Sequence, residues 1–93
     1  MRNQKMSSTI SDHYNYMEVR VLKINESLFS EKAKSITVPG ITGELQILSS
    51  HEPFVTVLKV GIITIVDTED KVHTFNIEHG YLEVTPEQVT VIL

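Results

Sequence analysis

Short apolar runs rich in β-branched residues, each ended by turn residues, follow one another along most of this chain. The alternation begins at residue 17, where Met17, Val19 and Val21 fall on one side of an extended chain and Glu18 and Arg20 on the other. Similar runs follow at residues 33–38, 44–48, 54–58, 62–66, 72–77, 81–84 and 89–93. The pattern predicts seven or eight short strands.

Turn residues separate these runs, and no long helix is expected between them. The turn signals are Pro39-Gly40, Gly43, Ser49-Ser50, Pro53, Gly61, residues 67–70, Gly80 and Pro86. The clearest hairpin joins two alternating runs through Asp67 to Lys71. We therefore predict an all-β fold, a small flattened sandwich or barrel of two antiparallel sheets with about eight to ten short strands.

The chain has 93 residues, which is the length of one domain with one core. Residues 1–16 are polar and aperiodic, so we expect a flexible polar N-terminal arm there and a β-sandwich domain over residues 17–93. The chain has no cysteine, which excludes a disulfide framework and a thiolate zinc site. The expected core consists of Val19, Val21, Ile36, Val38, Ile47, Val57, Ile63, Ile65, Phe75 and Val91.

The charge balance is acidic, with 8 Lys and Arg against 12 Asp and Glu. No run of basic residues is present, which disfavours binding to nucleic acid or to an anionic membrane surface. No apolar stretch approaches the roughly 20 residues that span a bilayer, and the first residues lack the apolar region of a secretory signal. We expect a soluble intracellular chain with no nucleic-acid partner and no direct insertion into a membrane.

Candidate catalytic and metal-binding groups are scattered along the sequence. The histidines at positions 13, 51, 73 and 79 lack the spacing of paired metal ligands, and Ser49-Ser50-His51 lacks the glycine-flanked turn of a serine nucleophile. No glycine-rich phosphate loop is present. We expect a non-enzyme with no catalytic residue, metal or cofactor. A small enzyme or ligand-binding barrel stays open as an alternative if His51, His73 and His79 converge on one pocket.

Several stretches resemble one known family. Residues 43–61, GELQILSSHEPFVTVLKVG, resemble the GELGILPGHxP signature and the following TxLKPG of the ATP synthase epsilon subunit, which is called delta in mitochondria. Residues 80–84, GYLEV, and 89–93, VTVIL, are similar to two later family stretches, and Leu28-Phe29-Ser30 matches the Phe-Ser step between its first two strands. The resemblance covers roughly residues 17–93.

The departures from the family pattern lie in or beside turns. Gln46 replaces a usual Gly, Ser49-Ser50 replace Pro-Gly, Val60 replaces Pro, and Glu78-His79 stand where small residues are common. We expect the fold to tolerate them. Family members usually continue into a C-terminal helical hairpin that can inhibit hydrolysis or bind ATP, and these 93 residues do not contain it. We expect the chain to be either cut at the domain boundary or a naturally short member.

The resemblance implies a non-catalytic rotor subunit in the central stalk of an F-type proton-translocating ATP synthase. Such a subunit links the gamma subunit to the c-ring and touches the F1 alpha/beta core only indirectly. Its expected location is the cytoplasmic face of a bacterial inner (plasma) membrane, or the matrix or stromal side in an organelle. The alternative is a generic protein-interaction module unrelated to ATP synthase.

The resemblance also assigns two interfaces. The c-ring interface comprises Ile41, Thr42, Gly43 and Glu44, with Glu44 facing loops that usually carry an arginine. The gamma-subunit interface comprises His51, Glu52, Pro53, Gly80, Tyr81 and Leu82. Tyr81 is either an interface anchor or a residue half-buried under its own sheet.

Overall fold

The computed structural model describes residues 16–49 and 52–93 of the chain. The expected N-terminal arm, apart from Tyr16, therefore lies outside the described residues, as do Ser50 and His51. The described residues form eight strands and no helix, which confirms the predicted all-β fold. No helix long and apolar enough to cross a membrane occurs in these two ranges.

The strands follow the predicted runs closely, with one exception. Their bounds are β1 Met17–Lys23, β2 Glu26–Gly40, β3 Gly43–Leu48, β4 Phe54–Leu58, β5 Gly61–Asp67, β6 Val72–Ile77, β7 Gly80–Val84 and β8 Gln88–Ile92. The exception is β2, which begins seven residues before the expected run at Ala33. The predicted hairpin between Asp67 and Lys71 is confirmed, because it joins β5 to β6 in antiparallel register.

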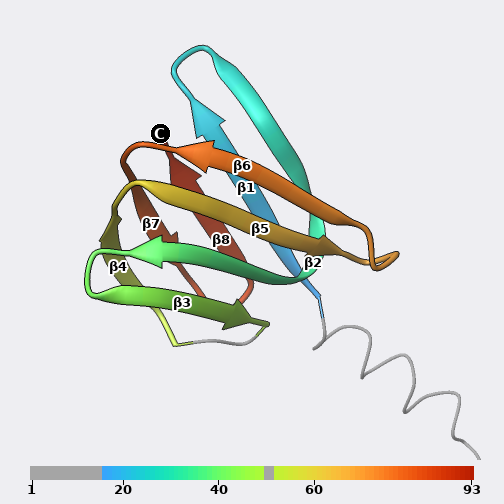
Figure 1. Cartoon of the computed structure of the whole chain (residues 1–93). Helices are drawn as coiled ribbons and strands as arrows, with labels where there is room; N and C mark the ends of the chain where they lie inside the picture. Colours follow the sequence, from blue (N-terminus) through green and yellow to red (C-terminus); the bar gives the residue numbers. More distant parts are fainter. Residues whose placement is uncertain (1–15, 50–51) are drawn as a thin grey trace, which may run out of the picture.

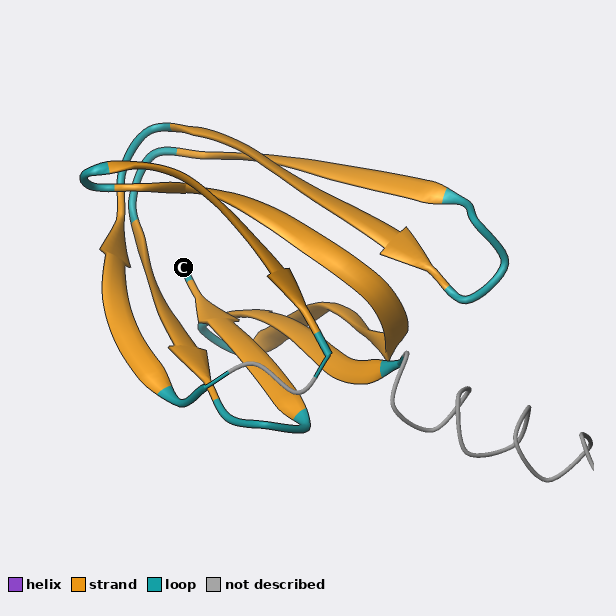
Figure 2. Cartoon of the chain, turned by 90° about the horizontal axis from the view of Figure 1, so that it is seen from below, coloured by secondary structure: helices purple, strands orange, loops and turns teal. Residues whose placement is uncertain are grey.

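The strands form two layers with the core between them (Figures 1 and 2). The first layer contains β1, β8, β7 and β4 side by side, and the second contains β3, the latter part of β2, β5 and β6. The pairing of β1 with β8 is parallel, so the expectation of purely antiparallel sheets is wrong at this position. Parallel partners need a long connection, and the rest of the domain supplies it.

The long strand β2 belongs to both layers. Its first part pairs with β1 from Met17↔Ala33 to Lys23↔Glu26, and its latter part pairs with β3 and β5. The pairing with β5 shifts register between Ala33 and Ser35, and an irregularity of this kind bends a strand and increases its twist. The chain thus changes layers without interrupting β2.

The turn before β2 was missed by the sequence analysis for a local reason. Ile24 and Asn25 form a two-residue connection, and Asn25 adopts the left-handed backbone conformation with φ of 63°. Asparagine tolerates this conformation, but the sequence here has no glycine or proline to mark it. Residues 26–32 are mostly polar because that part of the strand is exposed, and Phe29, expected between two strands, is buried within β2.

The core follows from the two-residue alternation of the strands. Eight of the ten expected core residues are buried, and Phe75 is half-buried against them. Val57 contradicts the expectation, because its residue surface is 42% exposed. In the run Phe54–Leu58 both faces hold two apolar residues, and Leu58 and Phe54 take the inner face together with Thr56. Val55 and Val57 therefore point outward.

Candidate functional site

The outer face of the first layer carries a row of apolar side chains. Val57 on β4 pairs with Tyr81 on β7, Tyr81 pairs with Ile92 on β8, and Ile92 pairs with Leu22 on β1. Tyr81 is 60% exposed, Ile92 48% and Val57 42%, while Leu22 is half-buried. We call these four residues the apolar row. Contiguous exposed apolar surface of this kind marks sites where another molecule binds.

A more polar row runs beside the apolar row on the same face. Val55 pairs with Glu83, Glu83 with Thr90, and Thr90 with Arg20. The row places a carboxylate and a guanidinium on different strands of one face. Opposite charges at separate positions beside an apolar surface favour one orientation of a partner over others.

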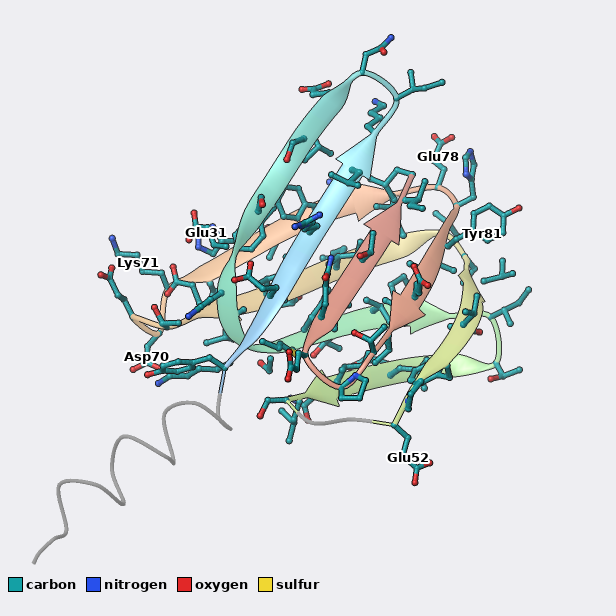
Figure 3. All side chains as sticks on the ribbon, turned by 180° about the vertical axis from the view of Figure 1, so that it is seen from behind. Glu31, Glu52, Asp70, Lys71, Glu78 and Tyr81 are labelled. Carbon is teal, nitrogen blue, oxygen red and sulfur yellow. The ribbon has the colours of Figure 1, made fainter. Side chains whose placement is uncertain are left out.

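The structure separates the roles of the three expected gamma-facing residues on β7. Tyr81 points away from the sandwich at the edge of the molecule in Figure 3, so its half-buried alternative is wrong. Leu82 is completely buried, because it faces the opposite way along the strand, and its side chain packs in the core. Gly80 is buried as well, and an added Cβ would lie 3.0 Å from Leu93 Cδ2. Leu82 and Gly80 support the surface that Tyr81 presents.

The other expected gamma-facing residues lie before β4. Glu52 and Pro53 are exposed, and Figure 3 shows Glu52 projecting from the opposite end of β4 from Tyr81. Pro53 precedes β4 at the two-residue spacing of Val55 and Val57, so it extends their outward side. His51 lies outside the described residues. The predicted gamma-facing set is therefore spread along the length of β4.

The expected c-ring residues form the hairpin turn between β2 and β3. Gly40 pairs with Gly43 around Ile41 and Thr42, and Ile41, Thr42 and Glu44 are exposed. Gly43 has φ of +144°, a conformation that a side chain would strain. A Cβ on Gly40 would lie 2.7 Å from the carbonyl oxygen of Gly43, so the tight turn depends on both glycines.

Backbone hydrogen bonds attach this turn to the end of the first layer. The N–H of Ile41 donates to the carbonyl oxygen of Val57 at 3.1 Å, and the N–H of Lys59 donates to that of Pro39 at 2.9 Å. Val57 belongs to the apolar row, so the turn adjoins that row directly. The expected c-ring turn thus lies next to the apolar row at the end of β4 that pairs with Tyr81.

Sequence reasoning missed most of the apolar row and two further exposed apolar residues. Leu22, Val57 and Ile92 each stand next to a buried residue, in the pairs Val21-Leu22, Val57-Leu58 and Val91-Ile92. Consecutive apolar residues in a strand indicate that both of its faces become covered. That signal identifies the row once the strands are known. Ile62, 55% exposed, carries the same signal because it precedes the buried Ile63, whereas Val60, 69% exposed between Lys59 and Gly61, carries none.

The alternative of a small enzyme or ligand-binding barrel requires His51, His73 and His79 to converge on one pocket. The structure describes His73 and His79, and these two do not converge. His73 lies near the start of β6 and bonds to Asp67, whereas His79 follows the end of β6 in an exposed turn. Six residues of extended chain separate the two by about 20 Å. Among the described residues no group of three histidine, aspartate or glutamate side chains is placed to hold a metal ion.

Comparison with known proteins identifies one family. The family described as "ATP synthase, Delta/Epsilon chain, beta-sandwich domain" matches residues 16–93. An ATP synthase epsilon chain from Desulfosudis oleivorans is 31% identical over 77 residues, which cover 83% of this chain and 58% of that protein. An ATP synthase epsilon chain from Neisseria meningitidis serogroup C is 38% identical over 77 residues, which cover 82% and 55%. The chain spans a little over half the length of these relatives.

Solved structures share the fold. A chain of the Euglena gracilis mitochondrial ATP synthase, in a structure of OSCP, F1 and the c-ring, matches with a TM-score of 0.79 and 22% identity, covering 84% of this chain and 50% of that one. A chain in the central stalk and c-ring structure of the Tetrahymena thermophila mitochondrial ATP synthase matches with a TM-score of 0.62 and 17% identity, covering 83% and 63%.

Proposed function

Because this chain belongs to the family of ATP synthase delta and epsilon chains, whose β-sandwich domain it contains, we propose that it is a non-catalytic subunit of the central stalk. In this role it links the gamma subunit to the c-ring of an F-type proton-translocating ATP synthase. The role needs a stiff body with two non-covalent surfaces and no reactive group. Two layers of paired strands around one core supply such a body.

The observation that carries the proposal is the apolar row on the outer face of the first layer. A permanent partner such as the gamma subunit would cover Tyr81, Val57, Ile92 and Leu22. Aromatic residues at the centre of an interface often supply a large part of the binding energy. Tyr81 has exposed apolar residues on both paired strands, so we assign it as the anchor.

The turn at Ile41 to Glu44 is proposed as the contact with the c-ring. Glu44 is an exposed carboxylate next to a rigid turn, Ile41 is exposed in that turn, and Val60 and Ile62 are exposed at the start of β5, the strand that pairs with β2. A carboxylate facing basic loops orients the subunit, although one exposed ion pair contributes only about 0 to 1 kcal/mol. The apolar residues would supply most of the attraction.

Co-elution with the purified gamma subunit on a sizing column at moderate salt tests the proposal. We expect a one-to-one complex with the unmodified chain. Tyr81→Asp should weaken that complex by more than about tenfold, because it places a charge in the centre of a desolvated surface. The matched control is Val72→Asp, since Val72 is 61% exposed on β6 in the other layer and should tolerate the change without loss of binding.

Two outcomes would contradict the proposal. A folded chain that fails to bind gamma would return the function to the generic interaction module. Equal loss of binding in Tyr81→Asp and Val72→Asp would show that the first layer is not the gamma-facing surface.

In the proposed role the subunit is peripheral on the cytoplasmic face of a bacterial plasma membrane, or on the matrix or stromal side in an organelle.

A further inference from the structure

An open hollow lies at the end of the second layer, where β5 begins and β6 ends. Its volume is about 420 Å³, comparable with small ligand pockets, which measure about 300 to 1,000 Å³. The residues that line it are Val60, Gly61, Ile62, Asn76, Ile77 and Glu78. We call it the β5–β6 hollow. It adjoins the proposed c-ring turn, because a Cβ placed on Gly61 would lie 2.7 Å from the Cβ of Pro39, the residue that pairs with Glu44.

The lining of the β5–β6 hollow is mostly apolar and carries one charge. Val60 and Ile62 are exposed on one wall, and the buried Ile77 belongs to the other. Glu78 is the one charged residue of the lining, with the neutral amide of Asn76 near it. Within residues 16–49 and 52–93 the exposed Glu78 carboxylate has no ion pair or side-chain hydrogen bond. The hollow therefore offers an apolar wall and an unpaired negative charge.

The two sides of Glu78 differ in charge. Figure 3 shows Glu78 projecting away from the ribbon at the turn that follows β6. Lys23 and His79 line a second hollow of about 380 Å³, together with Leu93 and the three residues that the two hollows share. A cation that approaches Glu78 through the second hollow is repelled by Lys23, whereas no residue that lines the β5–β6 hollow has a positive charge. The β5–β6 hollow is thus the side on which a basic group can reach Glu78.

These features fit the side chain of an arginine. Long basic side chains lay their methylene groups on apolar surface while the charged head keeps a polar environment. A guanidinium can donate two parallel hydrogen bonds to one carboxylate, and it stays charged at all pH values near neutral. In the β5–β6 hollow Val60 and Ile62 would contact the methylene groups, and Glu78 would accept the hydrogen bonds.

We propose that the β5–β6 hollow is a second contact with the c-ring and binds an arginine from one polar loop of the ring, while Glu44 faces another loop. This inference rests on the proposed function and extends it to a residue outside the expected c-ring interface. Glu78 stands where small residues are common in the family, so relatives with a small residue there would lack this contact.

The spacing of the two carboxylates requires two loops. Glu44 pairs with Pro39 across β3 and β2, and Ile62 pairs with Asn76 across β5 and β6, so the path from Glu44 toward Glu78 crosses four adjacent strands. Three steps of about 4.8 Å between strands give a separation of about 14 Å. An ion pair needs nitrogen and oxygen within about 4 Å, so one arginine cannot bind both carboxylates. A ring of identical subunits presents the same loop repeatedly, and binding two loops at once raises the overall affinity.

Binding of the chain to purified, detergent-solubilised c-ring, measured by surface plasmon resonance at moderate salt, tests the proposal. Glu78→Gln removes the charge at nearly constant size and should weaken binding about three- to tenfold. Glu87→Gln is the matched control, because Glu87 is an exposed residue after β7 whereas Glu78 precedes β7. The control removes the same charge at the opposite end of that strand, and the affinity should stay within about twofold. Both variants should keep the melting temperature of the unmodified chain, since both residues are exposed.

A double variant tests whether the two carboxylates act on separate loops. The factors by which Glu44→Gln and Glu78→Gln weaken binding should multiply when the changes are combined, as for independent sites. Equal affinity of Glu78→Gln and Glu87→Gln, or a double variant no weaker than Glu44→Gln alone, would overturn the second contact and leave the proposed function intact. Absence of binding by the unmodified, folded chain would overturn the proposed c-ring role together with this inference.

Discussion

Asp67 illustrates how one buried side chain organises several neighbours. Its three hydrogen bonds fix the β5–β6 turn, in which Asp70 adopts φ of 67°, and they reach the ring of His73. The sequence predicted this hairpin from its turn residues. It could not predict the buried carboxylate, because a run of Asp, Glu and Lys in a turn is normally solvated.

Because the pKa of Asp67 is lowered in the folded chain, part of the domain's folding stability is lost in acid. The carboxyl has its ordinary pKa of 3.8 in the unfolded chain and a lower pKa in the folded one. The contribution of the ionised Asp67 carboxyl to folding stability is therefore complete above its pKa in the unfolded chain. It is lost as the pH falls through its pKa in the folded chain. Urea unfolding at about pH 7 and about pH 2.5 should show a smaller loss of stability on acidification for Asp67→Asn than for the unmodified chain. An equal loss would show that other carboxylates account for the acid sensitivity.

A second prediction about a single residue concerns Glu44 and the proposed contact with the c-ring. Glu44→Lys reverses a charge on an exposed turn residue, so the melting temperature should stay nearly unchanged. Attachment to the c-ring should weaken, and more so at low salt, where charges act over longer distances. Glu26→Lys, an exposed change at the start of β2, is the matched control in a c-ring pull-down. A drop in melting temperature for Glu44→Lys would mark Glu44 as structural instead.

Among the elements, the strands with strict alternation were predictable and the irregular ones were not. β1 and β8 bury every second residue, so the core positions Val19, Val21 and Val91 could be assigned from the sequence. The start of β2 could not, because its exposed part alternates weakly and its turn uses Asn25. The orientation of β4 could not either, since it depends on packing against β7. Tertiary contacts decide the orientation of a strand whose two faces are equally apolar.

β1 gives the sharpest test of strand register. Val21 is fully buried and pairs with Phe29 on β2 and Val91 on β8. Val21→Asp would bury an unpaired charge between the layers and should cost more than about 4 kcal/mol, enough to unfold a small domain. Circular dichroism and solubility measure the outcome, with Arg20→Asp on the exposed side of β1 as the control. Soluble folded Val21→Asp protein would contradict the register.

At the scale of the whole molecule, the two candidate surfaces follow from the way the layers are joined. The turn at Ile41 and the apolar row meet because β4 bonds to both β2 and β7. The sequence could assign residues to two interfaces through the family resemblance alone. It could not show that they adjoin, because that depends on pairings between distant segments.

The topology also predicts how fast the domain folds. Pairing of β1 with β8 and of β4 with β7 joins segments far apart in sequence, so loop closure must precede much of the stabilisation. Refolding from urea should therefore take milliseconds to seconds, as in other all-β domains, and not microseconds. Stopped-flow fluorescence of the tyrosines measures this rate. A microsecond phase that accounts for the full amplitude would contradict the prediction.

The parallel pairing of β1 with β8 has a consequence for how the protein is made. β1 is synthesised before β8 and cannot obtain this second neighbour until residues 88–92 have been synthesised. Until then one edge of β1 is open, and Val19 and Val21 lack the strand that completes their cover. We expect chaperones to bind nascent chains that do not yet contain β8, and to release them once β8 has paired with β1.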